Sequence, residues 1–188
     1  MKAPSPLAYE PDQIRAAQQD ARAFQPLYER YHPAILRFVY RRVDSEALAA
    51  DITSQVFLKV LLHLKRYRIT EVPFSAWLYR IALNEIRQFF RHATQVRKVV
   101  IDERLLNELR SEDPESSDSV EAWRATLVQA IATLDPEEVN LLELRFFEQR
   151  PFREIGFMLD ITENYAKVKT YRLLDKLRKR MPLTSSLP

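Results

Sequence analysis

The 188-residue sequence contains no cysteine and only one glycine. The missing cysteine excludes disulfides, thiol nucleophiles and cysteine-bound zinc, and it fits a reducing compartment. Sheets joined by tight turns usually use glycine for positive φ angles, so this composition favours an all-helical protein with its eleven prolines at helix starts and in linkers. No apolar run approaches the roughly 20 residues that span a bilayer, and the first residues lack the apolar core of a signal peptide. We therefore expect a cytoplasmic protein without membrane insertion.

Charge is unevenly distributed along the chain, although the formal net charge is only +3. Residues 37–97 contain 11 basic and 5 acidic residues, a net +6, and residues 160–181 contain 7 basic and 3 acidic residues, a net +4. Between them, residues 102–121 contain 8 acidic and 2 basic residues, a net −6. Two basic blocks separated by an acidic strip suggest two surfaces for a polyanion, although solvated helix faces would give the same pattern.

Hydrophobic periodicity predicts an all-α chain of two small helical domains joined by an acidic flexible linker. Residues 1–23 are polar and contain prolines, so they form either a loosely held leader or a short helix. The first domain covers residues 24–97, and the linker covers residues 98–121. The second domain, residues 122–188, contains a helix-turn-helix pattern.

In the first domain, apolar residues recur every three or four positions from Phe24 to Val39, which predicts an amphipathic helix interrupted or bent near Pro33. Two further helices are predicted at about 45–67 and 74–92. The inner stripe of the helix at 45–67 consists of Ile52, Val56, Phe57, Val60 and Leu64. Its outer face then carries Asp51, Gln55, Leu58 and Leu62, and these two leucines require a partner.

The second domain has clear helix boundaries. Asp135, Pro136 and Glu138 are expected to start one helix as its cap, its first-turn proline and its capping-box acid. A short helix from residue 151, a turn at 160–162 and a basic helix over 163–180 follow. The inner face of this last helix is predicted to consist of Ala166, Thr170, Leu173, Leu174 and Leu177.

The last helix is the expected reader of duplex DNA. An α-helix fits the major groove, where outward side chains reach base edges and flanking amines hold phosphates. The outward residues of suitable type are Asn164, Lys167, Lys169, Tyr171 and Arg172.

Residues 66–90 interleave aromatic and cationic side chains. Proteins that bind single strands use this combination, because rings stack on exposed bases while arginines follow the backbone. The candidates are Arg66, Tyr67, Arg68, Phe74, Trp77, Tyr79, Arg80, Asn84, Arg87, Phe89 and Phe90. The alternative is that Phe74 and Trp77 are core anchors.

Two sets of motifs resemble the extracytoplasmic-function (ECF) sigma factors of the sigma-70 family. Segments 49–59 (AADITSQVFLK) and 74–84 (FSAWLYRIALN) resemble conserved region two of these proteins. Conserved region four of the family resembles this chain in four segments, 134–136, 144–147, 154–156 and 171–178. Together they cover about residues 24–181, in the family's order and with a linker where the family has one.

The resemblance implies a non-enzymatic subunit that brings RNA polymerase to selected promoters and helps to open them. Region two would bind the coiled coil of the largest polymerase subunit through Asp51, Ser54, Gln55, Leu58 and Leu62. It would capture a flipped base of the melted minus-ten element near Arg66, Arg68, Phe74, Arg80, Asn84 and Arg87. Region four would contact the polymerase flap and read the duplex minus-thirty-five element with Asn164, Lys167, Val168, Lys169, Tyr171 and Arg172. The acidic linker would thread toward the path of the RNA.

The turn at 160–162 departs from the family pattern, because Asp160 stands where the family usually has glycine. Aspartate enters the left-handed backbone region more readily than most residues, so the turn is still expected.

The helix at 45–67 also departs from that pattern. The family commonly has glutamates where this chain has Ala50 and Gln55, and a glutamine where it has Ser54, so Asp51 is the only acid between residues 47 and 71. Weak binding to core polymerase is expected. A phosphate on Thr53 or Ser54 would restore about −1.5 to −2 of charge beside Asp51. The helical wheel favours Ser54, whereas the family's kinase-paired groups favour Thr53. Control by a serine/threonine kinase and control by an anti-sigma factor both stay open.

Two other functional classes fit the sequence less well. A helix-turn-helix regulator that binds duplex DNA without joining polymerase would explain the last helix but not the aromatic and basic segment. An enzyme or metalloprotein is disfavoured, because His32, His63 and His92 lie in different helical segments without metal-ligand spacing. No phosphate-binding glycine loop is present either, so we expect neither a metal nor a cofactor.

Overall fold

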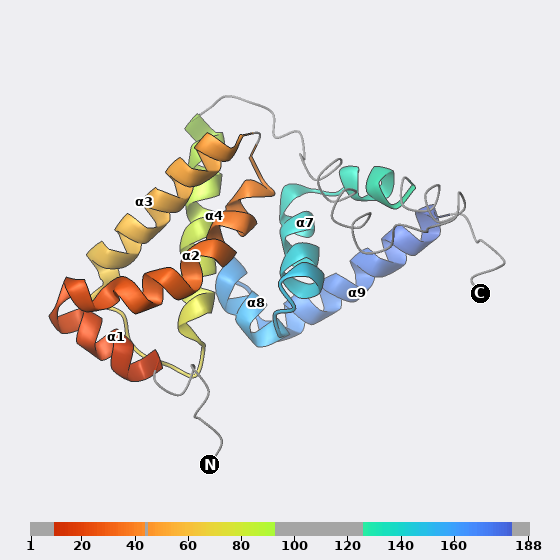
Figure 1. Cartoon of the computed structure of the whole chain (residues 1–188). Coiled ribbons are helices and arrows are strands. Elements are labelled where there is room, and N and C mark those ends of the chain that lie inside the picture. Colours follow the sequence, from red (N-terminus) through yellow and green to blue (C-terminus); the bar gives the residue numbers. More distant parts are fainter. Residues whose placement is uncertain (1–9, 44, 93–125, 182–188) are drawn as a thin grey trace, which may run out of the picture. The chain divides into compact units, whose positions relative to one another are not determined.

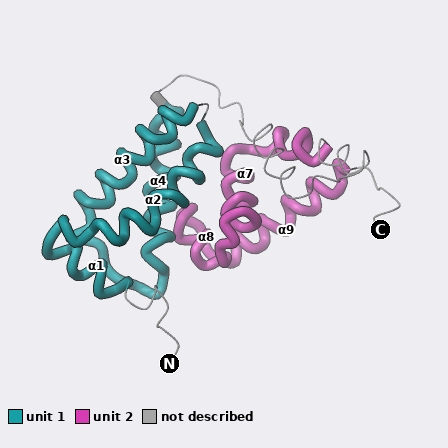
Figure 2. Tube along the Cα trace, in the orientation of Figure 1, with its two compact units in different colours: residues 1–95 teal, residues 96–188 magenta. Residues whose placement is uncertain are grey.

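The computed structural model describes residues 10–43, 45–92 and 126–181, and every regular element in these ranges is a helix (Figure 1). The chain divides into two compact units, residues 1–95 and 96–188 (Figure 2). The predicted all-α fold with two helical domains is therefore confirmed. The predicted linker at 98–121 lies outside the described residues.

The first unit is a bundle of α2, α3 and α4 with a shorter helix packed on it. Its elements are α1 (Glu10–Gln19), η2 (Ala21–Phe24), α2 (Gln25–Tyr40), α3 (Glu46–Leu64) and α4 (Phe74–His92). α3 packs against both α2 and α4, and α1 contacts α2 and α3. Ile14 and Ala17 of α1 are buried, so residues 10–19 form the short helix rather than a loosely held leader.

α2 continues through Pro33, so the predicted interruption is wrong. Proline removes one backbone donor and disfavours a helix interior. Here Leu27 and Ile35 lie on either side of it and are completely buried, whereas Pro33 itself is exposed. Tertiary packing therefore outweighs the local penalty.

α3 follows the predicted pattern closely. Ser45 caps it by accepting a hydrogen bond from the Leu48 backbone N–H at 3.2 Å. All five residues of the predicted inner stripe are buried, and the helix ends at Leu64, three residues earlier than expected. Among the described helices, α3 alone is long and apolar enough to cross a membrane by length and composition. The core helix of a soluble bundle has the same properties.

The second unit contains the helix-turn-helix. Residues 126–132 are helical, and they precede α7 (Pro136–Leu142), the π-helical turn η3 (Glu143–Phe147), α8 (Phe152–Leu159) and α9 (Glu163–Arg180). Asp160 ends α8 in the left-handed region at φ 60° and ψ 44°, as its identity predicted. α8 and α9 pack against each other across this turn. Leu174, predicted to face inward, is instead exposed.

Candidate nucleic-acid interfaces

The turn before α9 sets where the candidate reading residues lie. Thr162 caps α9 by accepting a hydrogen bond from the Tyr165 backbone N–H at 3.1 Å. Ala166, Thr170, Leu173 and Leu177 are buried, which fixes the rotation of the helix. The candidates Asn164, Lys167, Val168, Tyr171 and Arg172 are exposed, and Lys169 is half-buried. One helix thus presents all six, five of them as exposed side chains.

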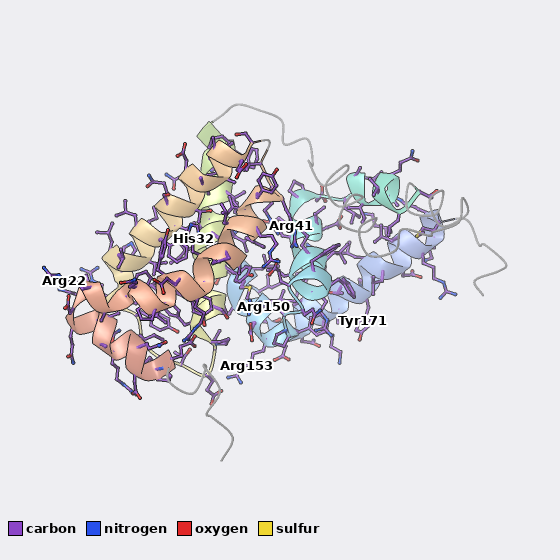
Figure 3. All side chains as sticks on the ribbon, in the orientation of Figure 1. Arg22, His32, Arg41, Arg150, Arg153 and Tyr171 are labelled. Carbon is purple, nitrogen blue, oxygen red and sulfur yellow. The ribbon has the colours of Figure 1, made fainter. Side chains whose placement is uncertain are left out.

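Tyr171, which is labelled in Figure 3, has neighbours that the sequence did not reveal. Its ring centroid lies 6.4 Å from that of Phe152 on α8, and the Arg145 guanidinium carbon lies 4.7 Å from the Phe152 centroid. Arg145 also donates a hydrogen bond to the Arg150 carbonyl oxygen at 3.0 Å. Tyr171 is therefore the exposed end of a row of side-chain contacts that begins at Arg145 in η3. The π-helical turn that carries Arg145 leaves no periodic signature, so sequence reasoning missed it.

Glu138 links the start of α7 to α9. Its carboxylate accepts a hydrogen bond from the Asp135 backbone N–H and lies 3.1 Å from the Lys176 ammonium. Burial acts to raise the pKa of Glu138. The hydrogen bond from Asp135 and the charges of Lys176 and Lys169 outweigh burial and hold this pKa below its usual value. The capping box predicted from sequence thus also helps to hold α9 in place.

The candidate single-strand surface surrounds the end of α3 and the outer face of α4. Arg66, Arg68 and Asn84 are exposed, whereas Arg80 and Arg87 are half-buried. Arg66 and Arg68 belong to segment 65–73, which joins α3 to α4. The structure thus keeps the predicted cations in contact with solvent to different extents.

Phe74 is a correction to the predicted base-stacking set. Its side chain is 1% exposed, and its ring packs among Tyr31, Tyr67 and Trp77 with centroid distances of 5.9, 5.2 and 5.5 Å. Stacking on a base would require removing this ring from the core, so Phe74 is an anchor. Tyr79 is buried in the same way and packs on Phe38. Trp77 is half-buried and lies against Tyr67 at 4.6 Å.

The outer face of α3 carries the candidate polymerase-binding residues. Asp51, Ser54, Gln55, Leu58 and Leu62 are all exposed, and the two leucines are 49% and 68% exposed. Leu61, which sequence reasoning did not include, is 39% exposed and enlarges the apolar part of this face. Such a row of exposed leucines is typical of a surface that a partner covers.

The two candidate hydroxyls differ in access. The Ser54 side chain is exposed and donates a hydrogen bond to the Ala50 carbonyl oxygen at 2.9 Å. Thr53 is completely buried. On the folded domain the Ser54 side chain is therefore accessible to solvent, whereas that of Thr53 is not.

Among the described residues, no group of three or more histidine or acidic side chains is arranged to hold a metal ion. His32 instead lies against the Tyr28 ring at 4.8 Å between centroids.

Known proteins share both domains. Residues 27–96 match the family described as Sigma-70 region 2, and residues 130–179 match Sigma-70, region 4. The ECF RNA polymerase sigma factor BldN of Streptomyces coelicolor is 29% identical over 168 residues, covering 89% of this chain but only 64% of BldN. The RNA polymerase sigma factor CarQ of Myxococcus xanthus is 31% identical over 167 residues, covering 89% of this chain and 92% of CarQ. The solved structure of CnrH in complex with the cytosolic domain of CnrY has a TM-score of 0.61 at 18% identity, covering 89% of this chain and 93% of that chain, which indicates a shared fold.

Proposed function

Because this chain belongs to the ECF sigma factors of the sigma-70 family, we propose that it directs core RNA polymerase to selected promoters and helps to open them. The observation that carries this function is the presence of regions 2 and 4 in one chain, each with an exposed face of suitable chemistry. Members of this family bind core RNA polymerase and promoter DNA and are not catalysts. They act where DNA and polymerase are, so we place the protein in the cytoplasm.

The division of labour follows the two units. We assign residues 10–97 to the region 2 domain, since α1 packs on it, residues 98–121 to a linker and residues 122–188 to the region 4 domain. The face of α3 around Leu58 and Leu62 would bind the coiled coil of the largest polymerase subunit. Region 4 would contact the polymerase flap.

Each domain would bind one promoter element. Arg66, Arg68, Arg80, Asn84 and Arg87 would hold the melted minus-ten strand, because cations follow a single-strand backbone and an exposed amide can bond to a flipped base. The exposed residues of α9 would enter the major groove of the minus-thirty-five duplex. Tyr171 is suited to this role because its ring is exposed and lies beside Phe152, which Arg145 covers.

Activity would depend on charge at the outer face of α3. This face has one acid, Asp51, where the family commonly has more, and Ser54 is an accessible hydroxyl one turn away. A phosphate there would add about −1.5 to −2 of charge and strengthen binding to a basic partner surface. A kinase acting on Ser54 would then activate the protein. An anti-sigma partner that covers Leu58 and Leu62 would restrain it.

A reconstituted transcription assay with core RNA polymerase and a promoter library tests the proposed function. We expect the chain to bind core polymerase and to enrich one class of promoters. A protein that binds duplex DNA but neither joins core polymerase nor supports initiation would be a helix-turn-helix regulator, and the proposal would be wrong.

A further inference from the structure

α1 reaches the segment that follows α3. The side-chain amide of Gln18 donates hydrogen bonds to the carbonyl oxygens of Leu64 at 3.0 Å and Tyr67 at 2.7 Å. These acceptors lie 46 and 49 positions further along the chain. A primary amide has two N–H donors on one nitrogen, so one glutamine can serve both carbonyls. α1 therefore braces the turn at which α3 ends.

The rest of α1 is fixed to the bundle. Ile14 is 2% exposed in the core, and at the other end of the helix Glu10 accepts a hydrogen bond from the Tyr31 hydroxyl. Arg30 lies 3.8 Å from the same carboxylate. Burial and the neighbouring Glu10 raise the pKa of Tyr31, so its phenol stays protonated and remains a donor. With both ends attached, α1 can hold the position of whatever Gln18 binds.

Gln18 and the aromatic core hold Tyr67 from two sides. Gln18 donates a hydrogen bond to the Tyr67 carbonyl oxygen. The centroid of the Tyr67 ring lies 5.2 Å from that of Phe74 and 4.6 Å from that of Trp77. Arg66 and Arg68 are its chain neighbours, and both are exposed. Because neighbouring residues are joined by planar peptide bonds, fixing the backbone of Tyr67 restricts the directions in which these two arginines leave the surface.

We propose that Gln18 is a positioning residue for capture of the melted promoter strand, acting through the backbone of Tyr67 to present Arg66 and Arg68. This inference rests on the proposed function of segment 65–73, and it adds the N-terminal helix to that machinery. A segment that is already ordered loses less conformational entropy when it binds, so preorganisation by α1 strengthens strand binding without a contact to DNA.

The experiment replaces Gln18 in the full chain assembled with core polymerase. Gln18→Leu keeps the approximate size and removes both hydrogen bonds, while Gln18→Glu keeps the shape and replaces donors by acceptors. The exposed neighbour supplies the matched control, Gln19→Leu. The probe is a fluorescent single-stranded oligonucleotide that carries the minus-ten sequence selected by the unmodified holoenzyme.

We expect each Gln18 variant to weaken oligonucleotide binding by about tenfold, because the segment that these two hydrogen bonds hold in the free protein must then be ordered on binding. Affinity for core polymerase and for the upstream duplex should be unchanged, and Gln19→Leu should change none of the three. If both Gln18 variants bound the oligonucleotide as the parent does, the proposal would be overturned. A parallel loss of core affinity in both would also overturn it, since that result indicates general destabilisation.

A mutant cycle separates positioning from stability. In the Arg66→Ala/Arg68→Ala background, Gln18→Leu should cause no further loss, because the side chains that it positions are gone. Additive losses would contradict the proposal. If the arginine variant binds weakly while Gln18→Leu binds normally, segment 65–73 keeps its proposed function and only the role of Gln18 falls. If the arginine variant also binds normally, the proposed function of the segment fails and the role of Gln18 fails with it.

Discussion

Gly156, the single glycine of the chain, lies in α8 where this helix faces the turn into α9. A Cβ atom at this position would lie 2.8 Å from the Ile161 carbonyl oxygen and 3.2 Å from the Glu163 backbone nitrogen. The Ile161 backbone N–H donates to the Gly156 carbonyl oxygen at 2.9 Å, so the turn is tied to this residue. Glycine thus permits the close approach of backbone that brings α8 and α9 together.

Gly156→Ala is expected to destabilise the region 4 domain by about 1–3 kcal/mol, the usual cost of overpacking. The added methyl group would clash with backbone atoms, which cannot move away as a flexible side chain could. Alanine's better helix propensity offsets only part of this cost. Thermal unfolding of the second unit is the measurement. Gln129→Ala, at an exposed helical position, serves as the control and should stay within about 0.5 kcal/mol of the parent. A higher melting temperature for Gly156→Ala would contradict the steric explanation.

Glu138 should make the region 4 domain sensitive to acid. Its pKa is lowered in the folded state from an ordinary value of 4.5, so its stabilising effect is complete above about pH 5 and is lost as the pH falls through the lower, folded pKa. Glu138→Gln keeps a capping-box acceptor but removes the charge that faces Lys176. The variant should be less stable at pH 7, and its stability should fall less than that of the parent between pH 5 and pH 3. Equal pH slopes in denaturant unfolding would refute this.

At the scale of whole elements, α3, α4 and α9 could be predicted because their information is local. Ser45 and Thr162 cap helices whose apolar stripes recur with helical spacing, so both starts and buried faces follow from the sequence. For α1 the sequence left a loosely held leader and a short helix both open, since Ile14 is its main apolar anchor. Its polar link through Gln18 spans 46 positions or more. The prediction that Phe74 stacks on a base was wrong for a similar reason. An aromatic ring beside cations looks the same in sequence whether it faces bases or the core.

The outer face of α3 yields a prediction about regulation. Ser54→Glu and the double variant Ala50→Glu/Gln55→Glu should each tighten binding to core polymerase by about twofold to fivefold per added charge, the range of an exposed charge pair. Ser54→Gln is the uncharged control of matched shape. Titration of labelled core polymerase measures the affinities. Equal affinity for all four proteins, parent included, would remove the electrostatic argument and leave control to an anti-sigma partner.

Thr53→Glu tests whether Thr53 or Ser54 is the modified residue. Because Thr53 is completely buried, a carboxylate there would enter the core without a partner and should destabilise the first unit by several kcal/mol. Circular dichroism during thermal unfolding is sufficient to see this loss. A stable Thr53→Glu protein that binds core polymerase more tightly than Ser54→Glu would show that α3 turns this position outward, and Thr53 would replace Ser54 as the modified residue.

For the whole molecule, we expect the two compact units to divide promoter recognition into separable steps. Each unit has its own core, Leu64 and Ile86 in one and Leu141 and Leu144 in the other, so a surface change in one should leave the other folded. The exposed DNA-facing candidates of the two units lie on α9 and around the α3–α4 segment. Binding of duplex and capture of the melted strand should then respond to different substitutions.

Arg172→Ala and Asn84→Ala test this separation. Arg172→Ala should weaken binding of the upstream duplex by about 1–3 kcal/mol if a base contact is lost, and it should leave opening of a promoter already bound at saturation unchanged. Asn84→Ala should show the reverse, with normal duplex binding and fewer open complexes detected by permanganate footprinting. Neither should alter affinity for core polymerase. Because the two residues belong to separate compact units, we expect their effects on overall promoter occupancy to add within about 0.5 kcal/mol in the double variant. A large departure from additivity would mean that the two steps are coupled through the polymerase. Loss of open complexes in Arg172→Ala at saturation would assign α9 a role in melting that its exposed face does not predict.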